Sequence, residues 1–154
     1  MFEVILMSVE RFLLALIVGG GIIMAVCVRP LLLQNLKQKD KLAFVNLIEG
    51  ISINVWNRYN IVAFVATAIM LALDILRIII RIKYSYWELV LETIILFLLF
   101  LKITLDKSLK KRLLEYGNSA INSSEQNKGH QLVELLSKVI LLLAIILLII
   151  PLQI

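Results

Sequence analysis

Long apolar runs alternate with short polar stretches along this chain of 154 residues. Four of the runs are nearly free of charge, and each has the length of about 17–25 residues that a helix needs to cross a bilayer. These runs are Phe12–Val28, Ile61–Ile80, Leu89–Leu105 and Leu132–Pro151. The pattern predicts an all-α, polytopic membrane protein: a single domain over residues 1–154, with four transmembrane helices in a bundle.

The segment between the first two runs has a helical periodicity of its own. Its apolar residues recur at spacings of three and four, at Phe44, Leu47, Ile48, Ile51 and Val55. We expect helix 1 to end near Pro30, because proline lacks the N–H group that would continue the helix. The amphipathic segment that follows then lies at the cytoplasmic interface or runs directly into helix 2. Further along, the polar stretch 117–129 predicts a flexible cytoplasmic linker.

Composition and charge support a membrane location and suggest an orientation. Hydrophobic residues make up 61% of the chain and the mean hydropathy is +0.97, whereas soluble domains are roughly 45–50% apolar. The chain has 16 lysine and arginine residues and 11 acidic residues, which gives a net charge of +5. Eleven of the basic residues flank the first and third connections, and four flank the opposite side. The positive-inside rule therefore predicts that loops 1 and 3 are cytoplasmic and that both termini lie outside.

The same charges bear on possible partners. The basic residues are not interleaved with aromatic residues as they are in the usual nucleic-acid modules. The expected partners are the lipid bilayer and either another membrane protein or a second copy of this chain, and no nucleic acid is expected.

Ionisable residues within a membrane span are costly and are candidates for function. One group flanks the predicted hairpin of helices 2 and 3, on the outer side: Asp74, Arg77, Arg81, Glu88 and Glu92. Facing residues of an antiparallel hairpin have a constant sum of position numbers, which pairs Arg81 with Glu88 and Arg77 with Glu92. Asp74 can also reach Arg77 at the i,i+3 spacing. These pairs either fasten the hairpin or form an entry path for protons or ions.

A second polar group is predicted at the cytoplasmic side: Asn54, Asn57, Arg58, Lys102, Asp106, His130, Glu134 and Lys138. Several of its members are four residues apart on one helix, and Glu134 before Lys138 is the favoured order for a helical ion pair. The group either converges at the cytoplasmic mouth of the bundle or extends its long side chains to the lipid head groups.

Candidate catalytic chemistry is sparse. His130 is the one histidine and Cys27 the one cysteine, and no C-x-x-C spacing is present. The chain also lacks a Walker pattern, a GxGxxG motif and a serine nucleophile with a credible base. No catalytic residue, cofactor or metal is therefore predicted.

Three consecutive glycines stand inside the first apolar run. Two pairs of small residues are four apart, Ala15 with Gly19 and Gly21 with Ala25, and Gly20 lies between them. Such pairs let a neighbouring helix approach closely in lipid. A phosphate loop would instead need a helix N-terminus in water and usually a lysine nearby. We expect a packing surface.

The order of these features is similar to the transmembrane protein 205-like family, a group of four-helix membrane proteins with a domain of unknown function. The resemblance rests on a glycine-rich first helix that ends in Arg29-Pro30, a loop with Gln34 and Phe44, and the stretch "GHQLVELLSKVILLL" over Gly129–Leu143. It implies a membrane protein without established enzymatic activity. The haem-binding membrane protoporphyrinogen oxidases are also related, but the histidine that they carry on the first helix is absent here.

Three functions follow in order of preference. The first is a non-enzymatic integral membrane protein, an accessory or assembly partner of other membrane components. The second is a small permease or ion- or proton-conducting protein, which would need a water-filled path from Asp74 and Glu92 to the region of Asn54 and Asn57. The third is a haem-linked membrane oxidoreductase, which would show a haem absorbance band.

Overall fold

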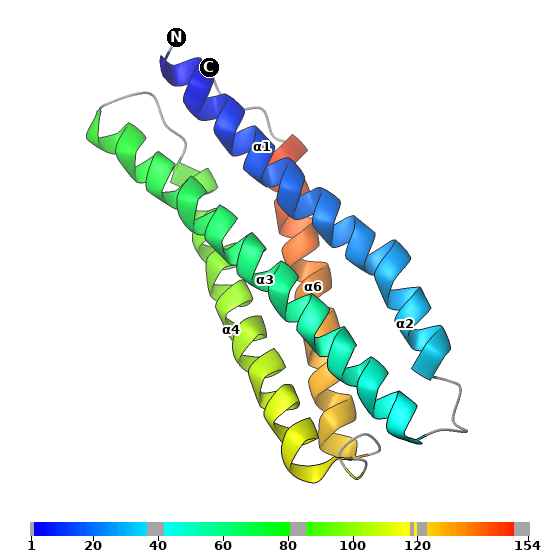
Figure 1. Cartoon of the computed structure of the whole chain (residues 1–154). Helices are drawn as coiled ribbons and strands as arrows, with labels where there is room; N and C mark the ends of the chain where they lie inside the picture. The colour runs from blue at the N-terminus through cyan, green and yellow to red at the C-terminus, as the bar shows by residue number, and fades with distance from the viewer. Residues whose placement is uncertain (1, 37–41, 81–85, 118, 120–122, 150–154) are drawn as a thin grey trace.

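The computed structural model describes residues 2–36, 42–80, 86–117, 119 and 123–149, and all elements in these ranges are helical. The elements are α1 (Phe2–Ile23), η1 (Met24–Val28), α2 (Arg29–Leu36), α3 (Leu42–Ile79), α4 (Tyr86–Tyr116) and α6 (Ser124–Ile149). The first three join end to end into one long rod (Figure 1). The predicted all-α class is confirmed.

Three segments are long and apolar enough to cross a membrane: Glu3–Leu32, Leu47–Ile79 and Ser124–Ile149. The predicted membrane class is supported by these three helices. The remaining long helix, α4, carries more charge. Glu88, Glu92, Lys102 and Asp106 are buried, whereas Lys107, Lys110 and Lys111, nearer its end, are exposed. The charged residues of α4 up to Asp106 are therefore on the face that packs against the other helices.

The four rods surround a common apolar core. The α1 helix packs on α3 and α6, and α4 also packs on α3 and α6. The start of α1 and the end of α6 lie at the same end of the molecule as the end of α3 and the start of α4 (Figure 1). Buried residues of α4 follow alternating spacings of four and three from Glu88 to Leu109. This is the repeat of helices that remain in contact along their length.

The prediction that helix 1 ends near Pro30 is wrong. The rod passes through Pro30 to Leu36 after one π-helical turn, in which the N–H of Arg29 donates to the carbonyl of Met24, five residues earlier. In a regular α-helix the ring of Pro30 would clash with the carbonyl of Val26. A wider π turn just before the proline offers a way to avoid this clash, as insertions in helices often do.

The connections also differ from the expected ones. Because α3 runs without a break from Leu42 to Ile79, the amphipathic segment continues directly into helix 2, the second of the two predicted alternatives. Gly117 ends α4 with φ of +52°, a conformation that glycine adopts easily. The helix α6 begins at Ser124, where Ser123 Oγ accepts the N–H of Gln126 at 3.1 Å. Residues 124–129 of the expected linker are thus helical, while the predicted end of helix 4 at Pro151 lies outside the described residues.

Candidate functional site

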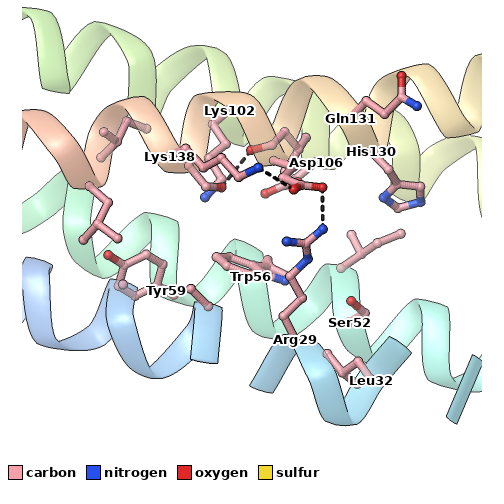
Figure 2. Close-up of a pocket in the computed structure, with 18 of the residues that line it drawn as sticks. Arg29, Leu32, Ser52, Trp56, Tyr59, Lys102, Asp106, His130, Gln131 and Lys138 are labelled. Atoms are coloured by element: carbon pink, nitrogen blue, oxygen red, sulfur yellow. Dashed lines mark hydrogen bonds and ion pairs between the residues drawn. The ribbon is translucent and has the colours of Figure 1, made fainter. Parts of the chain in front are cut away.

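A cavity of about 570 Å³ lies toward the end of the molecule at which α3 begins and α4 ends. The η1–α2 part of the rod and α3 form one side, and α4 and α6 form the other (Figure 2). Five residues of the predicted cytoplasmic group line it: Lys102, Asp106, His130, Glu134 and Lys138. The cavity is therefore the place where that group converges.

Lys102 forms the most unusual part of the wall, since its side chain is only 1% exposed. Its Nζ lies 4.6 Å from the ring centroid of Trp56 and 5.9 Å from that of Tyr59. Among the described residues, no carboxylate oxygen lies within 4.0 Å of this ammonium group. Asp106, one turn along the same helix, instead accepts a hydrogen bond from Asn60 Nδ2 at 2.6 Å. The buried ammonium group is thus stabilised mainly by aromatic rings and by a carboxylate beyond ion-pair distance.

Glu134 joins two cations at the same cavity. Its Oε2 binds the Arg29 guanidinium group, and its Oε1 lies 2.9 Å from Lys138 Nζ. The Arg29 side chain reaches across from the α2 side to the α6 side (Figure 2). One carboxylate therefore serves two positive groups, while the lining of the whole cavity includes three carboxylates, Glu49, Asp106 and Glu134, and three basic side chains, Arg29, Lys102 and Lys138.

Glu49 is held by an amide group and an imidazole ring. Its Oε1 accepts a hydrogen bond from Gln126 Nε2 at 2.8 Å and lies 3.1 Å from His130 Nε2. This contact connects the start of α3 with the start of α6. The carboxylates Glu49 and Asp106 thus have amide or imidazole partners, whereas the cationic side chains of the cavity keep donors free for a further acceptor.

Other residues of the predicted cytoplasmic group lie away from the cavity. Asn54 accepts a hydrogen bond from Lys110 Nζ at 2.9 Å on the exposed side, and Arg58 is exposed. Asn57 Oδ1 is buried and has no hydrogen-bond partner within the described ranges. The α3 residues that reach the cavity are Glu49, Ser52, Ile53, Trp56 and Tyr59.

A second polar group, at the opposite end, consists of five buried residues: Glu10, Asp74, Arg77, Glu88 and Glu92. Arg77 is at its centre, with Nη2 2.6 Å from Glu10 Oε2 and Nη1 3.4 Å from Asp74 Oδ1. We call this group the outer cluster. It fastens α1, α3 and α4 together through charged groups withdrawn from solvent.

The predicted contacts of the outer cluster are confirmed in part. The i,i+3 contact between Asp74 and Arg77 is present, but the predicted ion pair between Arg77 and Glu92 is wrong, because Arg77 binds Glu10 on α1 instead. The prediction from the hairpin register took only α3 and α4 into account, whereas the guanidinium group of Arg77 binds a carboxylate on α1. Arg81, the predicted partner of Glu88, lies outside the described residues.

Apolar side chains fill the space between the outer cluster and the cavity. Met70, Ile95 and Leu99 are at most 2% exposed and belong to one apolar core cluster. Thr67, the polar residue at this level of α3, donates its hydroxyl group to Ala63 O at 2.8 Å. The lining of the cavity includes no residue of the outer cluster. No group of three or more His, Cys, Asp or Glu in the described part of the chain could hold a metal ion.

The three glycines of α1 differ in their surroundings. A Cβ atom on Gly20 would lie 2.7 Å from Tyr59 Cε2, and one on Gly21 would lie 2.9 Å from Tyr59 Oη. A Cβ on Gly19 would meet nothing within 4 Å. Gly20 and Gly21 thus pack against another helix of this chain, whereas Gly19 and the exposed Ala15 make no such close contact; for these two, a packing surface toward another chain stays a prediction.

The remaining member of that predicted surface, Ala25, is exposed and lines the cavity. Because its side chain is a single methyl group, it takes up little of the cavity volume on this side. It therefore has a place in the candidate site and not in a packed helix contact.

No family model, curated protein or solved structure matches this chain. The assignment of a role therefore rests on the cavity and on the outer cluster.

Proposed function

We propose that the chain is a membrane protein of four spans that acts by binding and not by catalysis. The proposal that α4 is the fourth span is supported by the way its charged and apolar side chains are divided between its buried and exposed faces. Its charged residues in the middle of the helix are buried, while its exposed large residues there are apolar: Val90, Ile94, Phe97 and Phe100. Such a helix can face lipid in spite of its charge. The proposed orientation has loops 1 and 3 in the cytoplasm and both termini outside.

The proposed ligand is an organic anion, held in the cavity. The observation that carries this proposal is Lys102, a buried ammonium group at the wall of a cavity with no carboxylate in ion-pair contact. A buried charge of this kind is stabilised by a counter-charge. Arg29 and Lys138 supply further donors, and a volume of about 570 Å³ is within the range of small-molecule sites. The protein would present or retain this ligand as an accessory component of a membrane assembly.

The two other functions have less support. An ion path would have to cross the apolar layer around Met70 and Leu99. A haem-linked activity would need an axial ligand, and Nε2 of His130 is in contact with Glu49 and Gln126.

The fluorescence of Trp56 offers a direct test. The chain has two tryptophans, so a Trp87→Phe variant leaves Trp56 as the reporter beside Lys102. We expect butyl phosphate, but not butanol, to change this fluorescence saturably in protein held in nanodiscs. Lys102→Met should weaken the response about tenfold or more, since a charge-assisted hydrogen bond contributes about 1.5–3 kcal/mol.

Lys107→Met is the matched control, because Lys107 is an exposed lysine of the same helix outside the cavity. It should leave the titration unchanged. Equal responses of the Lys102→Met and Lys107→Met variants, or no saturable response at all, would contradict the proposal.

A further inference from the structure

We infer that the anion is the head group of a membrane lipid, whose hydrocarbon chain leaves the cavity sideways between the η1–α2 part of the rod and α6. This inference rests on the proposed function and names the class of its ligand. It is carried by the helix arrangement around the cavity, the apolar inner half of the cavity and the position of the cations.

The helix arrangement leaves one side of the cavity without backbone contact. Above the π turn, α1 packs on both α3 and α6. Beyond it, α2 keeps its contact with α3, and no comparable contact joins η1 or α2 to α6 in the ranges that the structure describes. The rod and α6 diverge toward this end (Figure 1). The cavity is nevertheless lined from both sides of this divergence, by Ala25 and Arg29 and by Glu134, Lys138 and Leu141.

The inner half of the cavity, next to the apolar core, is mostly apolar. Gly21, Ala25, Leu99, Ile140 and Leu141 line the cavity, and Tyr59 lies beside Gly21 with its hydroxyl group donated to Ile17 O. All the rod and α6 residues of this set fall within the segments that are apolar enough to span a membrane. A small hydrophilic anion would leave this half unfilled, whereas a hydrocarbon chain fills it and continues into lipid. Ala25 is exposed, and its small side chain is part of the lining on the rod side.

The cationic groups lie at the other half, which is more polar. Arg29 and Glu134 connect the two sides of the opening through their ion pair, and Lys138 shares the same carboxylate. Lys102 faces the cavity from α4. A phosphate or carboxylate group between these side chains accepts hydrogen bonds from Arg29, Lys102 and Lys138, whose N–H donors outnumber the contacts of Arg29 and Lys138 with Glu134. The head group thus stays near the interface while its chain extends toward Gly21.

The test uses the Trp87→Phe protein in phosphatidylcholine nanodiscs. The probe is phosphatidic acid that carries a nitroxide on its chain close to the head group, which quenches a tryptophan only at short range. We expect saturable quenching of Trp56 at low mole fraction. Phosphatidylcholine with the same nitroxide should quench at least tenfold less effectively, and phosphatidic acid labelled at the chain end should quench less than the probe labelled near its head.

Ala25→Leu adds bulk at the opening and removes no cationic group. It should weaken the quenching by the labelled phosphatidic acid about tenfold and weaken the butyl phosphate titration much less. Val26→Leu is the control, because Val26 is 66% exposed and does not line the cavity. It should change neither measurement, and circular dichroism of both variants reports whether they are folded.

The outcomes separate the two proposals. If butyl phosphate binds through Lys102 but neither the labelled lipids nor Ala25→Leu show the expected differences, the ligand is a soluble anion and the lipid inference is overturned. If Lys102→Met changes neither the lipid quenching nor the butyl phosphate response, both proposals fail. The comparison of lipid head groups and label positions needs no cavity variant, so it decides the lipid question even if Ala25→Leu does not fold.

Discussion

The glycines of α1 allow a test of the packing with an internal control. Gly19, Gly20 and Gly21 are consecutive residues of one helix, so replacing each by alanine makes the same chemical change. On helix propensity alone, alanine is favoured over glycine by about 1 kcal/mol. Because a Cβ on Gly19 meets nothing within 4 Å, Gly19→Ala should leave stability unchanged or raise it by up to about 1 kcal/mol.

Gly20→Ala should have the opposite effect. Its Cβ would lie 2.7 Å from Tyr59 Cε2, and this ring cannot withdraw freely, because Tyr59 Oη donates to Ile17 O at 2.7 Å. The ring also has an edge contact with Trp56. Overpacking costs about 1–3 kcal/mol, and loss of the hydrogen bond would add about 0.5–1.5 kcal/mol. After subtracting the gain in propensity, we expect a net destabilisation of about 1–3 kcal/mol.

Unfolding of the purified protein in detergent, followed by circular dichroism, measures the difference. The Gly20→Ala protein should unfold about 2–12 °C below the wild type, given about 2–4 °C per kcal/mol for a chain of this size. Gly21→Ala should also destabilise, and a Tyr59→Phe background should relieve part of its cost, since its close contact is with Tyr59 Oη at 2.9 Å. Equal stabilities of the Gly19→Ala and Gly20→Ala proteins would refute the packing of Tyr59 against this helix.

Three further predictions concern the rest of the molecule. Arg77→Met should destabilise the protein by about 3–5 kcal/mol, because it leaves two buried carboxylates without their cation. Arg58→Met is the control, since Arg58 is exposed, and it should change stability by about 0.5 kcal/mol or less. The same unfolding assay compares the two variants. A cysteine at Ser123, in a Cys27→Ser background, should not react with a membrane-impermeant maleimide added to intact cells, and rapid labelling would reverse the proposed orientation. An absorbance scan of the purified protein should show no haem band, and a band lost in His130→Ala would restore the oxidoreductase hypothesis.

The sequence predicted the helical class and the approximate position of each apolar helix, because both depend on local properties. Hydropathy over about 20 residues is enough to find a span. Helix boundaries were less accurate at Pro30, since a proline is compatible with a continuing helix when the preceding turn widens. The sequence carries no local signal that separates a π turn from a helix end.

The sites were predicted only where they, too, depend on local spacing along one helix. His130, Glu134 and Lys138 share a helical face by their spacing, and they do line the cavity. The partners that complete the sites are far apart in sequence, such as Glu10 beside Arg77 and Glu49 beside His130. No spacing rule connects such pairs, because they depend on how separate helices pack. The choice of Glu10 over Glu92 as the partner of Arg77 is of this kind.

The π turn before Pro30 has a consequence for insertions and deletions. A π turn contains one residue more than the α-helical turn that it replaces, so the extra residue of Met24–Val28 is absorbed within one turn. Deleting one residue there would return the rod to a regular helix and leave the later residues on nearly the same faces, so Arg29 would still face Glu134. The ring of Pro30 would then clash with the carbonyl four residues before it. A deletion in this segment is therefore expected to act through the proline and not through the direction in which α2 presents its cation.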